Sequence, residues 1–276
     1  MKSGVLGLAA LVVAGATLHA QAFSSDPRAK KAIDDAVAAL GGERFLNMHD
    51  RVETGRAYSF YRDQISGLSI ATIFTQYFDV PAGKTGTDLG VRERQVFGKN
   101  EEFGYVLFRE DGAWEVTFRG PREMDQDRVD SYRRNTLNDI LYILRMRLHE
   151  PGLIFDWKGS DVIENTPVNV VDVVDSQNRV VTVNFNQFTK LPVRETWVWL
   201  DPKTKERNQE VARYGVYRDD GSGIQWPQQI TRERNGEKKY QMFADSLLVN
   251  QNLPDAVFEK PTGPATKTPW KAPKKK

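Results

Sequence analysis

The sequence predicts an α+β protein built mainly from antiparallel strands. Residues 168–249 read as at least six short strands, which follow one another through turns rich in Asp, Asn and Gly. Two helical stretches, 26–40 and 125–149, lie between strand groups without the regular strand–helix–strand alternation of a parallel sheet. The predicted order is therefore helix, strands, long helix, strands.

The first 22 residues have the pattern of a secretory signal peptide. Lys2 precedes an apolar run from Gly4 to Leu18, and Ala20-Gln21-Ala22 matches an A-x-A cleavage site. We therefore expect residues 1–22 to be removed and the mature chain to begin at Phe23. The product is expected in the periplasm. No later apolar run reaches the roughly 20 residues that a membrane-spanning helix needs.

The chain contains no cysteine. It therefore offers no thiol for lipidation, no disulfide framework and no thiolate ligand for a metal. We expect a soluble protein that is not lipidated.

The sequence contains no catalytic motif that survives inspection. Gly83-Lys84-Thr85 resembles the end of a phosphate-binding loop, but Phe78 occupies the place of the first glycine. His49 and His149 follow the signal peptide, and neither has the spacing of a zinc motif or a local triad. We predict a protein that is not an enzyme and has no catalytic residue, cofactor or metal. A hydrolase with a scattered site around one histidine is the alternative.

Charge divides the mature chain into two parts. Residues 261–276 contain four prolines and five lysines but no acid, a composition that predicts a disordered basic tail. The whole sequence has a net charge of +2, and without Lys2 and the five lysines of the tail, residues 23–260 carry a net charge of −4. These residues are predicted to form one domain. Such a tail could bind an anionic membrane surface at about 1 kcal/mol per lysine, or serve only solubility. Nucleic-acid binding is not expected of an exported protein with an acidic body.

The first helix is delimited by strong signals at both ends. It begins at Asp26-Pro27, an N-cap followed by a first-turn proline, and ends at Gly41-Gly42. The strands expected after it are 52–61, 68–78 and 91–97, followed by a hairpin of 103–109 and 114–119 that turns at Asp111-Gly112.

One long helix is predicted from about Asp125 to His149. Its apolar residues recur at three- and four-residue steps, and acidic residues favour its N-terminal end. Pro151-Gly152 ends it. The apolar arc widens in the C-terminal half, which should therefore be buried on more than one side.

The strand 193–200 is unusual because both of its faces are apolar. Thr196-Trp197-Val198-Trp199-Leu200 lacks the alternation of a strand with one solvated face. We expect both faces to be covered. A helix and a cavity wall would do this, and so would a plain sandwich of two sheets.

Several stretches together resemble the LolA-like superfamily of periplasmic lipoprotein carriers, receptors and sensors. The resemblance rests on the signal peptide, Ala39-Leu40-Gly41-Gly42, the segment 185–194 with its Thr189-Lys190-Leu191-Pro192 turn, and residues 252–258 (NLPDAVF). It spans most of residues 26–258. It implies an incomplete antiparallel β-barrel, or half-barrel, covered by the N-terminal helix and the long central helix. The absence of a lipidated cysteine departs from the lipidated members.

The resemblance further implies a carrier that holds lipid or lipoprotein acyl chains on a concave apolar face. Apolar burial would drive binding, at about 0.8 kcal/mol per methylene. A cell-envelope sensor or assembly factor that binds a protein partner with the same fold is the alternative. The candidate lining residues, chosen because they share strand phases, are Phe74, Phe78, Trp114, Phe118, Val183, Phe185, Trp197 and Trp199.

Overall fold

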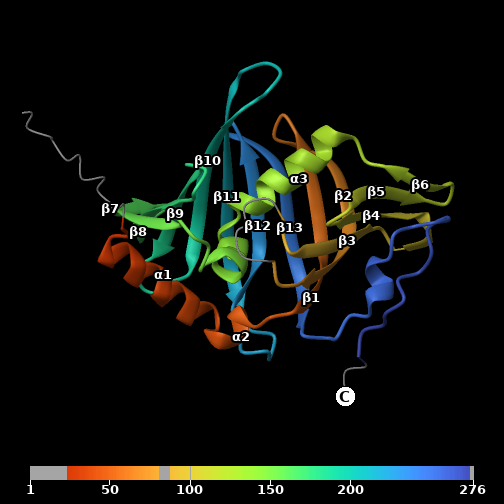
Figure 1. Ribbon diagram of the computed structural model, residues 1–276, viewed down its shortest axis with the longest axis horizontal. Helices are drawn as coiled ribbons and strands as arrows, with labels where there is room; N and C mark the ends of the chain where they lie inside the picture. The colour runs from red at the N-terminus through yellow and green to blue at the C-terminus, as the bar shows by residue number, and fades with distance from the viewer. Residues whose placement is uncertain (1–23, 81–87, 100, 274–276) are drawn as a thin grey trace, which may run out of the picture.

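The chain folds around one large antiparallel sheet (Figure 1). A computed structural model describes residues 24–80, 88–99 and 101–273; the predicted signal peptide lies outside them. The strands are β1 (Asp50–Tyr61), β2 (Gln64–Tyr77), β3 (Val91–Phe97), β4 (Gly104–Arg109), β5 (Gly112–Thr117), β6 (Gly120–Glu123), β7 (Ile154–Ile163), β8 (Thr166–Val174), β9 (Val180–Asn186), β10 (Pro192–Leu200), β11 (Arg207–Arg218), β12 (Trp226–Arg234) and β13 (Glu237–Val249).

The sheet joins two meanders. In the described residues its thirteen strands run in the order β6-β5-β4-β3-β2-β1-β13-β12-β11-β10-β9-β8-β7. Neighbours in the sheet are therefore also neighbours in sequence, except where β1 pairs with β13. There Arg51 lies opposite Val249, and Ser59 lies opposite Tyr240. The sheet curves but stays open. The predicted α+β half-barrel is thereby confirmed.

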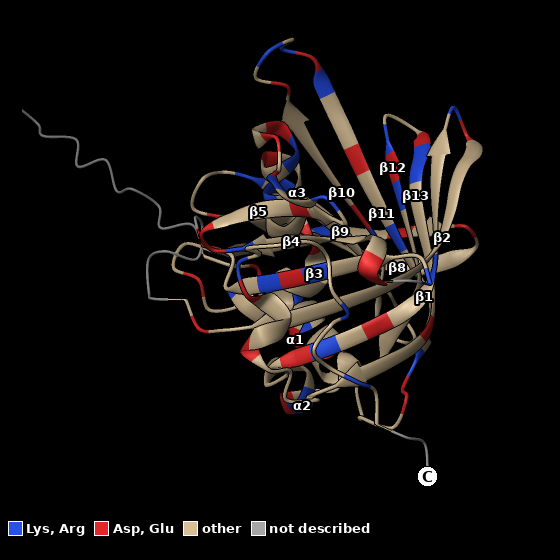
Figure 2. Ribbon diagram, turned by 90° about the vertical axis from the view of Figure 1, so that its right-hand side faces the viewer, with Lys and Arg blue, Asp and Glu red and all other residues tan. Residues whose placement is uncertain are grey.

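Charged residues of both signs are interspersed along the strands and at their tips (Figure 2). Many make exposed pairs, such as Arg56 with Asp245 at 3.7 Å on neighbouring strands. Pairs of this kind contribute under about 1 kcal/mol each. The fold therefore depends on its apolar clusters rather than on the surface charges.

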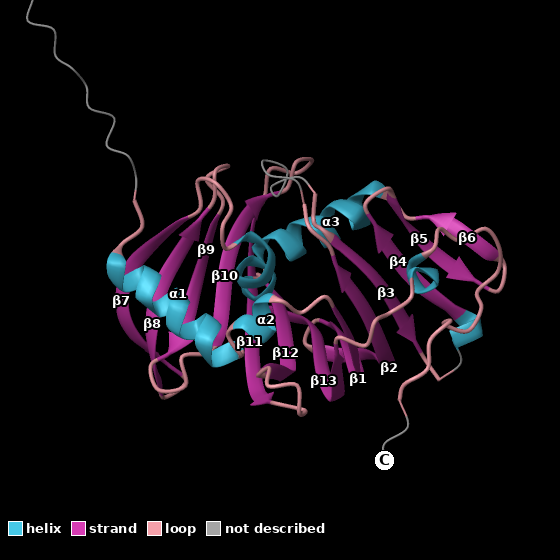
Figure 3. Cartoon of the chain, turned by 60° about the horizontal axis from the view of Figure 1, so that its bottom comes forward, coloured by secondary structure: helices cyan, strands magenta, loops and turns pink. Residues whose placement is uncertain are grey.

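The helices lie on the concave side of the sheet (Figure 3). The helix α1 (Pro27–Leu40) begins where the Asp26 carboxylate accepts a hydrogen bond from the Arg28 amide at 2.7 Å, as predicted. It ends at Gly41, whose φ of 130° suits glycine. There a Cβ would lie 2.6 Å from the Gly223 carbonyl oxygen. The short helix α2 (Glu43–Leu46) follows.

The central helix is not continuous, contrary to the prediction. It consists of α3 (Gln126–Asn138), α4 (Ile140–Tyr142) and the π-helical turn η2 (Ile143–Arg147). The break is at Asp139, whose ψ is 123° and whose side chain accepts hydrogen bonds from the Leu141 and Tyr142 amides. Asp139 thus starts a new helix inside an unbroken apolar pattern. Among the described residues, no helix is long and apolar enough to cross a membrane.

The two faces of the sheet carry separate apolar clusters. On the concave face, α1 and α4 cover a core that includes Val171, Val183 and Phe185. On the outer face, Phe74, Leu107 and Trp114 pack against residues that follow β13. The helices therefore cover the concave face, and the C-terminal segment covers the outer face of β1–β5. It does not reach β10, where the outer-face residues Val198 and Leu200 are 40% and 65% exposed. The expectation that both faces of the strand 193–200 are covered is therefore wrong.

The C-terminal segment, residues 250–273, is ordered along the outer face, so the expectation of a disordered tail is wrong for residues 261–273. It contains the turn η3 (Asp255–Phe258) and ends near Trp270, whose ring meets Phe74 edge-on at 5.7 Å. The Ala265 amide donates to the Thr117 carbonyl at 2.9 Å. The composition is rich in Pro and Lys, but Trp270 gives the segment a large apolar side chain that packs against the sheet. Residues 274–276 lie outside the described part, and the membrane contact of the tail stays a prediction.

Asp50, at the start of β1, anchors the C-terminal segment. Its side chain is buried, and its two carboxylate oxygens accept hydrogen bonds from the Gln251 amide at 2.6 Å and the Leu253 amide at 3.0 Å. Its backbone carbonyl accepts from the Asn250 amide at 2.9 Å. One residue therefore fixes the direction in which the chain leaves β13.

We expect Asp50→Ala to destabilise the protein by about 2 kcal/mol or more, since each buried donor left without a partner costs about 1–3 kcal/mol. Urea unfolding would measure the loss. Asp245→Ala, on exposed β13 surface, is the matched control and should change stability by less than about 0.5 kcal/mol. Equal stabilities of the two variants would contradict the anchoring role.

Candidate functional site

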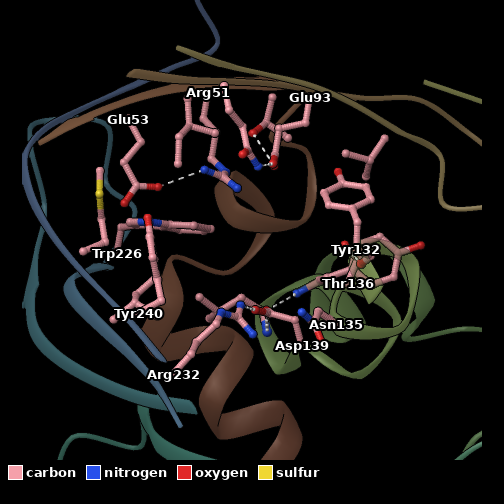
Figure 4. Close-up of a pocket in the computed structure, with 18 of the residues that line it drawn as sticks. Arg51, Glu53, Glu93, Tyr132, Asn135, Thr136, Asp139, Trp226, Arg232 and Tyr240 are labelled. Carbon is pink, nitrogen blue, oxygen red and sulfur yellow. Dashed lines mark hydrogen bonds and ion pairs between the residues drawn. The ribbon is translucent and has the colours of Figure 1, made fainter. Parts of the chain in front are cut away.

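A cavity of about 380 Å³ lies between the concave face of the sheet and the broken central helix (Figure 4). We call it the central cavity. The strands β1, β2, β3, β12 and β13 form its floor, and α3 and α4 form its roof. Its lining residues are Arg51, Glu53, Ile73, Thr75, Tyr77, Val91, Glu93, Gln95, Phe97, Tyr132, Asn135, Thr136, Asp139, Leu141, Tyr142, Trp226, Ile230, Arg232, Tyr240 and Met242.

Two other hollows are less suited to hold a ligand. One of about 620 Å³ lies beside β9 and β11 near Leu191 and Tyr217, but it is shallow and open to solvent. Another of about 280 Å³ lies around Phe78 and Phe108. The hollow around Phe78 also lies between strands and α3, but most of its charged residues are exposed. The central cavity is larger, and its charged residues are buried or half-buried, among them Glu53, which is 4% exposed. We therefore take it as the candidate site.

Two arginines in the central cavity are already engaged. Arg51 donates to Glu53 at 3.0 Å and to the Tyr77 hydroxyl at 3.0 Å, and its guanidinium lies 4.7 Å from the ring centre of Trp226. Arg232 donates to Asp139 at 2.7 Å. Burial raises the pKa of Glu53, and the Arg51 guanidinium opposes that rise. Each guanidinium charge is therefore paired with a carboxylate before any ligand arrives.

Glu93 differs from the other cavity carboxylates. It accepts hydrogen bonds from the Gln95 amide group and the Thr75 hydroxyl, both neutral donors. Among the ion pairs of the described residues, none includes Glu93, whereas Glu53 and Asp139 each have an arginine partner. The described lining thus contains three carboxylates and two guanidinium groups.

Several polar atoms of the lining lack a well-formed hydrogen bond among the described residues. They are the indole nitrogen of Trp226, which lies near Glu53, the hydroxyl of Tyr132, which lies near Thr136, and the side-chain oxygen of Asn135. Trp226 is only 3% exposed. Buried polar groups are normally paired, so these atoms indicate places where a ligand or ordered water can bind.

A second carboxylate supports the roof from behind. Glu195, on β10, is fully buried, and its side chain accepts a hydrogen bond from the Ile140 amide at 2.7 Å. Burial raises the pKa of Glu195, the nearby Asp139 carboxylate adds to the rise, and Arg232 opposes it. The resulting pKa is about 8. Near neutral pH, Glu195 is therefore mostly a neutral acid. Together, Glu195 and Arg232 hold the helix break at Asp139 over the cavity.

None of the eight sequence-predicted lining residues lines the central cavity. Val183, Phe185 and Trp197 lie in the helix-covered core, with Trp199 at its margin. Phe74 and Trp114 lie on the opposite face of the sheet, under the C-terminal segment. Phe78 borders the smaller hollow, and Phe118 is 64% exposed. The predicted set is therefore divided between two faces.

Sequence reasoning missed the charged cavity floor. Arg51 and Glu53 alternate with Val52, and Glu93 and Gln95 alternate with Arg94. The alternation shows that these polar residues share a face, but a polar face usually points to solvent. Their meeting under a helix depends on strand pairing between distant segments.

The two histidines stand apart from the cavity. His149 is exposed. The His49 side chain is half exposed, and its ring lies 3.2 Å from the Asn252 side-chain oxygen and 3.5 Å from Asp50. Neither histidine lines the central cavity. The hydrolase alternative required a concave polar cluster around one of them, and it gains no support.

We expect the free energy of unfolding to fall as pH rises from 4.5, the ordinary pKa of a glutamate, to about 8. The folded state keeps the Glu195 proton that the unfolded chain releases, which gives a slope of about 1.4 kcal/mol per pH unit. Glutamine does not titrate, so the Glu195→Gln variant should lose this contribution to the pH dependence of the free energy of unfolding. The control variant Glu206→Gln, in the exposed turn after β10, should keep the pH dependence of the wild type. Urea unfolding at several pH values checks this; parallel profiles for Glu195→Gln and the wild type would refute it.

Comparison with known proteins gives matches to structures alone. No family model matches the chain, and no curated protein matches its sequence. An outer membrane lipoprotein-sorting protein domain from Vibrio parahaemolyticus is 11% identical, with a TM-score of 0.53, over 83% of this chain and 97% of that one. A DUF1329 family protein from Desulfovibrio piger is 16% identical, with a TM-score of 0.56, over 85% and 98%.

A LolA superfamily protein from Nitrosomonas europaea also matches, at 12% identity and a TM-score of 0.49, over 82% of this chain and 97% of that one. At such identities, structural similarity establishes the fold and leaves function open. The fold that the sequence resemblance implied is confirmed by the first two structures: the chain shares their fold, and its own sheet is open and antiparallel with helices on its concave side.

Proposed function

We propose that this chain is a non-enzymatic binding protein of the cell envelope, which carries a lipid or a lipoprotein acyl chain in the central cavity. The observation that carries the proposal is the cavity of about 380 Å³ enclosed between sheet and helix. Ligand pockets typically measure about 300–1,000 Å³, so this cavity suits one small amphiphile rather than several chains together.

The lining supplies the contacts that an amphiphile needs. Ile73, Leu141, Ile230 and Met242 provide apolar wall, against which each buried methylene contributes about 0.8 kcal/mol. The polar atoms that lack a well-formed hydrogen bond provide hydrogen bonds for the other end of the ligand. A cavity with both kinds of surface favours a molecule with an apolar chain and a polar group.

Periplasmic placement belongs to the same proposal. It is supported by the signal-peptide pattern of residues 1–22 and by the fold shared with an outer membrane lipoprotein-sorting protein domain. An exported carrier would meet amphiphiles that need shielding from water between membranes.

Filling the cavity tests the carrier function. We expect Ile73→Trp to reduce ligand occupancy about tenfold, equivalent to about 1.4 kcal/mol, because the indole would occupy space that the ligand needs. Ile70→Trp is the matched control, since it makes the same change on the same strand but on the outer face. Native mass spectrometry of protein purified from the periplasm, followed by organic extraction, would measure bound lipid. A ligand-free wild type that also takes up no added lipid would exclude the carrier function.

A second candidate function is the binding of a protein partner. It is favoured by exposed apolar residues on the outer face of β2, where Leu68 is 63% exposed and Ile70 is 40% exposed. Exposed apolar patches often mark interaction surfaces. Crosslinking in periplasmic extract would test it: Leu68→Glu should abolish a specific crosslinked partner, and Ile73→Trp should not.

A further inference from the structure

We propose that the ligand of the central cavity carries a cationic group, a primary ammonium, at its polar end. The inference rests on the proposed carrier function and specifies which amphiphile the cavity selects. It follows from three features of the lining: its charge, its unfilled acceptors and its aromatic rings.

The charge of the described lining is negative. Its three carboxylates face two guanidinium groups, and each guanidinium is committed to a carboxylate, Arg51 to Glu53 and Arg232 to Asp139. Glu93 is left with neutral partners. An anionic head group would meet this carboxylate without a free cation to receive it, and the interior dielectric would strengthen the repulsion. An ammonium group would complete the charge balance.

The unfilled hydrogen-bond acceptors match the donors of an ammonium group. The Asn135 side-chain oxygen and the Tyr132 hydroxyl lack a well-formed hydrogen bond among the described residues, and both residues are on α3 (Figure 4). A primary ammonium has three N–H donors and no acceptor. Glu93 and the Tyr132 hydroxyl offer acceptors for such donors on one side of the cavity, and Asn135 offers a further acceptor beside Asp139 (Figure 4). The Trp226 nitrogen, a donor, lies on the opposite wall beside Glu53 (Figure 4).

The aromatic lining is also suited to a cation. Six aromatic residues border the cavity, among them Tyr132, Trp226 and Tyr240. Aromatic faces attract guanidinium and ammonium groups within about 6 Å of the ring centre. Arg51, at 4.7 Å from the Trp226 ring, shows that the cavity already stabilises one cation in this way. Outside the cavity, charges of both signs are interspersed, so the negative lining is a local property (Figure 2).

Three amphiphiles with the same chain and different ends test the proposal: dodecylamine, dodecanol and dodecanoate. Titration near neutral pH, followed by tryptophan fluorescence and calorimetry, would give their affinities for the mature protein. We expect dodecylamine to bind about tenfold or more tightly than dodecanoate, with dodecanol between them. This comparison uses the wild type and does not depend on the folding of any variant.

Variants locate the preference within the cavity. Glu93→Gln should remove most of the preference for the amine, and Glu93→Asp should retain much of it because the charge remains. Glu123→Gln, on the exposed strand β6, is the control and should behave as the wild type. Equal affinities for the three ligands, or tighter binding of dodecanoate, would overturn the ammonium assignment and leave the carrier function standing. If none of the three binds and the purified protein contains no lipid, both fail.

Discussion

The pairing of β1 with β13 is the constraint on which the structure depends. Each meander is built from hairpins between neighbours in sequence, and either could form its ladder alone. The pair Arg51–Val249 and those that follow it join the two meanders into one curved surface. The central cavity spans this junction, with Arg51 and Glu53 on β1 and Tyr240 and Met242 on β13. Without this pairing, the cavity floor would not exist.

Local chemistry made much of the fold predictable. The Asp26-Pro27 start of α1 and the turn at Asp111-Gly112 are encoded within a few residues, and the structure begins a helix and turns a hairpin there. The antiparallel class followed from the absence of strand–helix alternation. The break at Asp139 could not be predicted in the same way, because the Ile140 amide finds its partner in Glu195, which lies far away in sequence. Similarly, Trp270 packs against Phe74, a residue far away in sequence.

The site was less predictable than the fold, for a definite physical reason. Apolar residues were chosen as candidates because a lipid carrier needs apolar surface. Most of them belong to the hydrophobic clusters that pack the helices and the C-terminal segment against the sheet. Phe185 and Trp197 stabilise the core, and Phe74 and Trp114 fix the C-terminal segment. The cavity instead has a mixed lining, in which charged residues are buried because they are paired. In the sequence, a charged strand residue that is buried in such a pair looks the same as one that faces solvent.

The junction of β1 with β13 also has a kinetic consequence. β1 ends at Tyr61, and its partner strand begins at Glu237, so most of the chain must be available before the sheet can close. Contacts between residues so far apart in sequence slow folding, because the entropy of closing the long loop is lost before the contacts stabilise the chain. A chain emerging from the ribosome lacks this contact until β13 has been made. The junction, and with it the floor of the cavity, can therefore form only after both meanders have emerged.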